Sequence, residues 1–170
     1  VLIVGGDDIS YGGCLPEGTT YKQKMLKELE GTLDLSRIHF LGKLPYLQYL
    51  KVLQVSRVHV YLTDPFVLSW SALEAMATGC LLVASRTQPV EEVITNNENG
   101  LLVDFFKPEE IAEKVIEALK NPQDYMNLRN RARQTAIERF DLETKCLPEQ
   151  MDFIAEVAGK KFSNTGKTVH

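Results

Sequence analysis

The run from residue 65 to residue 85, which has one charged residue, constrains this chain more than any other part of its sequence. In PFVLSWSALEAMATGCLLVAS the only charged side chain is Glu74. A carboxylate among apolar residues is costly to desolvate unless something hydrogen-bonds it, and no basic residue lies nearby in the sequence. The run must therefore fold so that Glu74 meets a hydrogen-bond donor, and a bound ligand is one candidate for that donor.

The length of the run raises the question of a membrane span, which needs about 20 apolar residues. Small and polar residues interrupt it at Pro65, Ser69, Ser71, Thr78 and Gly79. Gly79 is typical of a helix stop before a β-rich run. In place of a span, the sequence predicts a loop over residues 63–68, a short buried helix over 69–78 and a buried strand over 81–84.

Composition narrows the class of protein. The 170 residues, 44% of them hydrophobic, fit one domain with a full core. A net charge of −4 without a stripe of Lys and Arg argues against nucleic acid as a partner. The three cysteines are Cys14, Cys80 and Cys146. Their odd number and the absence of metal-ligand spacing favour buried thiols in a reducing compartment, so we expect a cytoplasmic protein.

The ends of the chain carry two expectations. It opens on a strand-like run at Val1 with no initiator Met and no visible targeting segment, which indicates a fragment of something longer. At the other end, residues 159–170 are polar and without periodicity, which predicts a disordered tail.

Strand-like apolar runs alternate with helical patterns along the rest of the chain. The predicted strands cover residues 1–4, 38–41, 58–62, 81–84 and 101–105. The predicted helices cover residues 21–33, 46–56, 69–78, 90–95, 108–120, 125–140 and 143–157. This alternation predicts an α/β fold: a Rossmann-like three-layer α/β/α domain over residues 1–158, with a parallel sheet of five or six strands.

In open parallel sheets, ligands bind beyond the carboxyl ends of the strands. The loops over residues 5–13, 42–46, 63–69 and 85–90 are therefore expected to carry the site. We expect the backbone N–H groups of residues 68–71 to point outward at the start of a helix, which makes a ready site for a phosphate.

Glu74 lies one turn beyond that phosphate site, where its carboxylate would accept hydrogen bonds from the adjacent hydroxyls of a ribose. The alternative is structural: Ser69 merely caps the helix, and Glu74 bonds to a nearby backbone N–H or to Ser71. The residues alone leave both open.

Several other residues invite a functional interpretation beside a structural one. Asp7 and Asp8 follow a strand and are more typical of turn formers than of a metal pair, so no metal site is predicted. His39 and His59 are expected as tolerated strand residues. Tyr11 and Trp70 are candidates for stacking on a base or sugar, with the core as the alternative for Trp70. Four arginines predict a solvated helix face, or a surface for acidic phospholipid: Arg129, Arg131, Arg133 and Arg139.

Four blocks of the sequence together carry a family resemblance. They are VLIVGG, RIHFLGKLPY, SWSALEAMATGCLLVAS and PVEEVITNNENGLLVDFFKPEEIAEKVIEAL. Their order, spacing and content over residues 1–157 resemble the C-terminal half of nucleotide-sugar-dependent glycosyltransferases of the group 1 (family 4) type. The resemblance implies a GT-B fold, hexosyl transfer from a nucleoside-diphosphate sugar with retention, and no cofactor besides that donor substrate.

The resemblance also implies roles for individual residues. Family members carry two glutamates separated by seven residues before the Ala-Met-Ala of this helix. Glu74 matches the second, which implies contact with the donor ribose. Phe66 stands at the position of the first, and Ser69 stands where a second glycine usually falls. The remaining donor-binding residues that we expect are Val67 and Leu68 near the diphosphate, Gly42 and Lys43 at the nucleobase, and Gly5 and Gly6 in the first loop.

By the same resemblance, much of the enzyme lies outside this chain. The paired basic residues that hold the diphosphate and the acceptor-binding N-terminal domain would precede Val1, so catalytic residues are expected mainly there. The fragment would then hold a donor half-site without turnover, and the full-length protein could associate peripherally with a membrane.

Two other functions stay open at this point. A GT-B sugar epimerase is the nearer one. A non-catalytic flavodoxin-like module for assembly or signalling is the other, with Asp64 at the end of the third strand as its phosphorylatable residue. The long apolar loop after Asp64 argues against that module.

Overall fold

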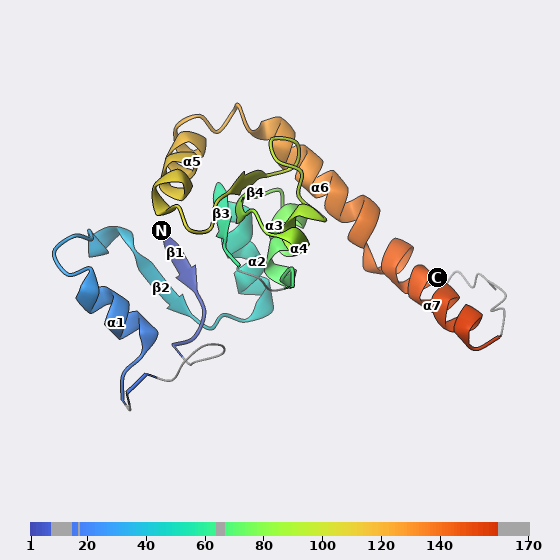
Figure 1. Cartoon of the computed structure of the whole chain (residues 1–170), viewed down its shortest axis with the longest axis horizontal. Helices are drawn as coiled ribbons and strands as arrows, with labels where there is room; N and C mark the ends of the chain where they lie inside the picture. Colours follow the sequence, from blue (N-terminus) through green and yellow to red (C-terminus); the bar gives the residue numbers. More distant parts are fainter. Residues whose placement is uncertain (8–14, 17, 64–66, 160–170) are drawn as a thin grey trace. The chain divides into compact units, whose positions relative to one another are not determined.

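The computed structural model describes residues 1–7, 15–16, 18–63 and 67–159, and it divides the chain into two compact units, Val1–Val52 and Leu53–His170. The first unit holds strands β1 (Leu2–Val4) and β2 (His39–Gly42), which pair in parallel (Figure 1). Helix α1 (Tyr21–Glu28) and a 3₁₀ turn (Leu35–Arg37) lie between these strands in the chain. Helix α2 (Tyr46–Val55) carries the chain into the second unit.

Helix α1 begins as its sequence dictates and ends earlier than the periodicity predicts. Thr20 and Gln23 form a capping box, in which the Gln23 N–H donates to Thr20 Oγ1 at 3.2 Å and the Thr20 N–H donates to Gln23 Oε1 at 2.9 Å. The apolar spacing runs on to residue 33, but the helix ends at Glu28. Gly31 adopts a φ of +77°, a left-handed conformation that an α-helix cannot continue through.

The second unit is a three-stranded parallel sheet in the order β3-β4-β5. Its strands are β3 (Val58–Tyr61), β4 (Leu81–Ser85) and β5 (Leu101–Val103). The crossover from β3 to β4 contains α3 (Trp70–Ala77), and the crossover from β4 to β5 contains α4 (Gln88–Glu91). Three further helical elements follow β5: α5 (Pro108–Lys120), α6 (Met126–Phe140) and, after a π-helical turn (Leu142–Cys146), α7 (Leu147–Val157).

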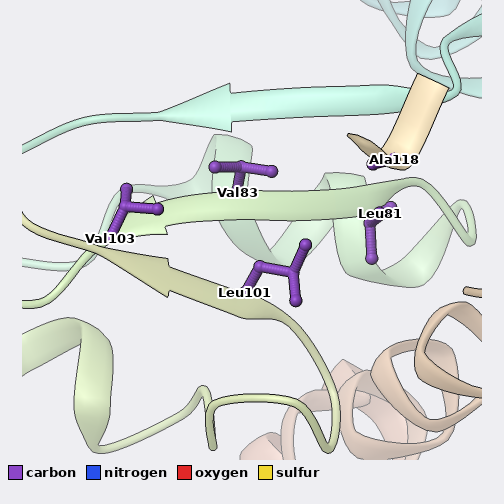
Figure 2. Close-up of a cluster of buried hydrophobic side chains, with 5 residues drawn as sticks. All are labelled: Leu81, Val83, Leu101, Val103 and Ala118. Atoms are coloured by element: carbon purple, nitrogen blue, oxygen red, sulfur yellow. The ribbon is translucent and has the colours of Figure 1, made fainter. Parts of the chain in front are cut away.

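The core of the second unit is built on β4, whose five residues are all buried. On one face of the sheet, Leu81 and Val83 pack with side chains of β5 and with Ala118 of α5 (Figure 2). Alternate residues of a strand point to opposite faces, so Leu82 and Ala84 face the other side of the sheet. Helices α3, α5 and α6 all contact β4. Packing on both faces explains why residues 81–84 of this strand are all apolar instead of alternating with polar ones.

The α/β fold with parallel pairing is confirmed, but the prediction of one sheet with five or six strands is wrong for the described residues. They hold five strands, divided between a two-stranded and a three-stranded sheet. Alternation of strands and helices predicts that neighbouring strands run parallel, yet it carries no information on which sheet each strand joins. The second difference is α4, which begins at Gln88 after Thr87 and not at residue 90, because Pro89 suits the first turn of a helix.

Helix α7 leaves most of its large apolar side chains exposed. Phe153 is 66% exposed and Val157 is 73% exposed. No helix in the described ranges has the length and apolar character that a bilayer span requires. The predicted polar tail lies outside the described residues apart from Gly159, and the assignment of residues 1–158 to one domain stays a prediction.

A buried amide joins the turn before β5 to helix α6. Asn99 is 6% exposed, and its Nδ2 group donates to Val93 O at 3.0 Å and to Thr135 Oγ1 at 3.1 Å. Its Oδ1 atom accepts from the Thr95 N–H at 2.7 Å. The next residue must be glycine, since a Cβ atom at Gly100 would lie 2.7 Å from Ile94 Cγ2.

We expect Asn99→Ala to lower the free energy of unfolding by about 2–4 kcal/mol, because it removes three hydrogen bonds and leaves buried backbone groups unpaired. Urea denaturation followed by circular dichroism measures this. Asn130→Ala on the exposed face of α6 is the matched control and should change stability by no more than about 0.5 kcal/mol. Equal effects of the two substitutions would contradict the role given to Asn99.

The two described cysteines are free, and they should differ in reactivity. Cys80 is 1% exposed and its thiol donates to Ser56 O at 3.3 Å. Burial raises the pKa of Cys80 to about 11, and the charge of Arg129 opposes this rise. At pH 8 we expect iodoacetamide to alkylate Cys146 and to spare Cys80 in the folded protein, as read by peptide mass spectrometry.

The raised pKa of Cys80 also predicts a pH dependence of stability. The thiol ionises near pH 9.0 in the unfolded chain, below its pKa in the folded protein. The contribution of the buried neutral thiol to the free energy of unfolding is therefore complete below pH 9 and is lost as the pH rises toward 11. The difference in unfolding free energy between the wild-type protein and Cys80→Ala should therefore shrink between pH 8 and pH 10.5. A constant difference across that range would show that the folded thiol ionises normally.

Candidate functional site

The start of helix α3 forms the best-defined part of the predicted site. Ser69 is the N-cap, with φ −79° and ψ 149°, and its Oγ atom accepts a hydrogen bond from the Ser71 N–H at 3.2 Å. The two hydroxyl groups lie 3.1 Å apart. An N-cap serine satisfies one of the backbone donors that a helix leaves unpaired at its start, so the capping role predicted for Ser69 is present.

The expectation that all four N–H groups of residues 68–71 point outward is wrong for two of them. The Ser71 N–H is used by the cap, and the Ser69 N–H donates to the Tyr61 hydroxyl at 2.8 Å. The amides of Leu68 and Trp70 have no hydrogen-bond partner within the described ranges. These two amides, at the positive end of the α3 dipole, are what the helix offers to an anion.

Glu74 lies on α3, one turn in from the cap, and is half-buried. Its carboxylate makes no hydrogen bond and no ion pair with the part of the chain that the structure describes. The structural alternative paired it with Ser71 or a nearby backbone N–H, and neither pairing is present: the Ser71 hydroxyl faces Ser69 instead. Glu74 thus keeps its full capacity to accept hydrogen bonds from a ligand.

Residues of the first unit bring two of the predicted glycines together. The Gly5 N–H donates to Gly42 O at 3.0 Å, where β1 and β2 end side by side. Both have left-handed backbones, with φ of +149° and +65°. A cavity of about 780 Å³ adjoins Gly5, Gly6 and Gly42, and its other lining is mainly apolar side chains of β1, α1, β2 and the segment between α1 and β2. Lys43, the next residue, is exposed.

The remaining candidates fall in different places. Phe66 lies outside the described residues, as do Tyr11, Asp8, Cys14 and Asp64. Asp7 pairs with Lys22 at 3.6 Å. Trp70 is 80% exposed, so the alternative that placed it in the core is wrong. His39 is exposed on β2, while burial on β3 lowers the pKa of His59 and keeps it neutral near pH 7.

The four arginines of α6 make hydrogen bonds or an ion pair with other parts of the chain. Arg129 Nε donates to Gly79 O at 2.7 Å, and Arg133 donates to Ala77 O. Both carbonyls lie at the C-terminal end of α3, where a cation is favourable. Arg139 donates to Glu92 O at 3.2 Å, and Arg131 pairs with Glu98 at 3.4 Å. Arg131, Arg133 and Arg139 are exposed, as the predicted solvated face requires, while Arg129 is half-buried.

Sequence reasoning missed Tyr61 as a neighbour of the site. This residue is 8% exposed at the end of β3, and its hydroxyl also lies 3.5 Å from Val67 O. Valine and tyrosine are common in strands, so nothing in the sequence distinguishes Tyr61 from an ordinary strand residue.

Comparison with known proteins places the chain in a family. The sequence profile described as "Glycosyl transferases group 1" matches residues 1–135. An uncharacterized glycosyltransferase of Methanocaldococcus jannaschii is 31% identical over 97 residues, which are 56% of this chain and 25% of the relative. The N-acetyl-alpha-D-glucosaminyl L-malate synthase of Bacillus anthracis is 30% identical over 107 residues, which are 63% of this chain and 28% of that enzyme. The chain thus spans about a quarter of these relatives.

The fold is also similar to that of solved structures. The Anabaena protein HepE, solved in complex with UDP, superposes with a TM-score of 0.75 at 21% identity, over 93% of this chain and 40% of HepE. At this identity the likeness concerns the fold alone. Since the family profile covers most of the sequence and the fold agrees with it, the chain belongs to the group 1 family of glycosyl transferases.

Proposed function

We propose that this chain is the donor-binding half of a glycosyltransferase that moves a sugar from a nucleoside-diphosphate sugar to an acceptor. The observation that carries the proposal is Glu74: a half-buried carboxylate with no partner in the described structure, one turn beyond two unpaired amides. A ribose linked to a diphosphate has the complementary groups, two hydroxyl donors and an anion. Membership of the family supports the same assignment.

In this proposal the diphosphate lies at the start of α3. The N–H groups of Leu68 and Trp70 donate to its oxygens, and the helix dipole favours its charge. Val67 and Ser69 line the same turn. When the bond between the sugar and the diphosphate breaks, negative charge accumulates on the leaving oxygen, and donors already in place stabilise it there. Glu74 holds the ribose and takes no part in bond breaking.

Other parts of the proposal concern the whole protein. Because the chain spans about a quarter of its curated relatives, we propose that an acceptor-binding domain and further diphosphate-binding groups lie elsewhere in the protein. Retention of the anomeric configuration, contacts of Gly42 and Lys43 with the nucleobase and peripheral membrane association stay predictions. The free thiols of Cys80 and Cys146 support a reducing compartment, the cytoplasm.

The first test is nucleotide binding by the chain itself. We use UDP as the probe because related structures contain it. With part of the diphosphate contacts absent, we expect a dissociation constant from high micromolar to millimolar, about −4 to −6 kcal/mol, in an NMR titration of the ¹⁵N-labelled chain. The amides of Leu68 and Trp70 should shift. Tight binding that survives Glu74→Ala would place the nucleotide elsewhere.

The second test separates ligand binding from folding at Glu74. Glu74→Gln keeps the size of the side chain but loses charge-assisted hydrogen bonds, so sugar transfer by the full-length protein should fall about ten- to a hundredfold. The melting temperature should barely change, since the carboxylate has no protein partner to lose. Glu113→Gln, an exposed site on α5, is the matched control. A destabilised Glu74→Gln protein with near-normal specific activity would end the ribose hypothesis.

A further inference from the structure

Tyr61 connects the sheet of the second unit to the first residues of α3. Its phenol oxygen accepts the Ser69 N–H at 2.8 Å and lies 3.5 Å from Val67 O. The ring is buried at the end of β3, where it pairs in register with Ala84 of the fully buried strand β4. A ring held by the core in this way gives its hydroxyl a fixed position.

A second hydroxyl holds the chain where it leaves β3. Ser85 is completely buried, and its Oγ atom donates to Thr63 O at 2.7 Å while it accepts from the Thr63 N–H at 2.9 Å. Thr63 follows β3 and Ser69 is the N-cap of α3, and the backbone of each is hydrogen-bonded to a hydroxyl group of the sheet. Among the residues that the structure describes, the backbone of Ser69 otherwise bonds only to α3 itself, through the bond from the Ala72 N–H to Ser69 O.

We propose that Tyr61 is a positioning residue for the donor diphosphate. Its hydroxyl holds the backbone of Val67 and Ser69, and so directs the unpaired amides of Leu68 and Trp70 toward one anion. This inference rests on the proposed function. Because the hydroxyl already accepts the Ser69 N–H, that amide is a structural donor and does not contact the phosphate.

The alternative is that Tyr61 is an ordinary core residue whose hydroxyl contributes only to stability. The two roles differ in what Tyr61→Phe changes. This substitution keeps the buried ring and removes a single oxygen. A positioning role predicts weaker nucleotide binding by a folded protein, because the amides no longer share one orientation. A purely structural role predicts a lower melting temperature with unchanged affinity.

The experiment is an NMR titration of the ¹⁵N-labelled chain with UDP, together with amide hydrogen exchange and thermal denaturation. For Tyr61→Phe we expect a dissociation constant about five- to tenfold higher than for the wild type, and faster exchange of the Ser69 amide. Tyr125→Phe is the matched control: it also removes a single phenol oxygen, at the turn where α5 leads into α6 and away from the start of α3. Its affinity for UDP should stay within about twofold of the wild type.

Equal or tighter UDP binding by folded Tyr61→Phe would overturn this inference and leave the proposed function standing. A wild-type chain whose α3 amides do not respond to UDP would overturn both. If Tyr61→Phe does not fold, the wild-type chain decides: UDP should shift the amides of Leu68 and Trp70, and Ser69 should exchange more slowly than Trp70 with and without UDP. Equal exchange at Ser69 and Trp70 would refute the inference.

Discussion

The second unit depends on the complete burial of strand β4. Helices α3, α5 and α6 pack against the strand between its two neighbouring strands, and all five of its residues are removed from water. This requirement selects Leu, Val and Ala and excludes charge. The first polar side chain, Ser85, comes at the carboxyl end of the strand, where it pairs with backbone groups of Thr63. The candidate site thus begins where the apolar layer ends.

The site beside that edge uses backbone groups and hydroxyls, with a single charge. Tyr61, Ser69 and Ser71 satisfy one another and the nearby amides in a short chain of hydrogen bonds. Glu74 and the amides of Leu68 and Trp70 stand outside this set of hydrogen bonds. The hydrogen bonds around them are formed before a ligand arrives, so binding need not order this part of the site. The same property lets the proposed donor contacts be tested one atom at a time.

The bounds of a helix could be predicted where residues that start or stop a helix stand at both of its ends, and could not be predicted where such residues are missing. Pro108 and Asn121 bracket α5, and its predicted bounds agree with the structure. Helix α1 was overextended because its apolar spacing continues past Gly31. The Ser69 cap and the setting of Glu74 follow from local pattern. The Tyr61 hydroxyl was missed because a bond between residues eight apart, from strand to helix cap, leaves no pattern. The same holds for Arg129 and Arg133, whose carbonyl partners are about fifty residues away in the sequence.

Those two arginines have an electrostatic consequence for the opposite end of α3. The helix has eight residues, so its ends are about 12 Å apart. The guanidinium groups of Arg129 and Arg133 lie at the carbonyls of the C-terminal end. Their positive charges offset the negative pole of the helix dipole. An anion at the N-terminal end is then attracted by groups that it never touches. The separation of about 12 Å between these charges and the anion exceeds the Debye length of about 8 Å at physiological ionic strength. Salt should therefore weaken this long-range attraction much more than it weakens the direct amide contacts.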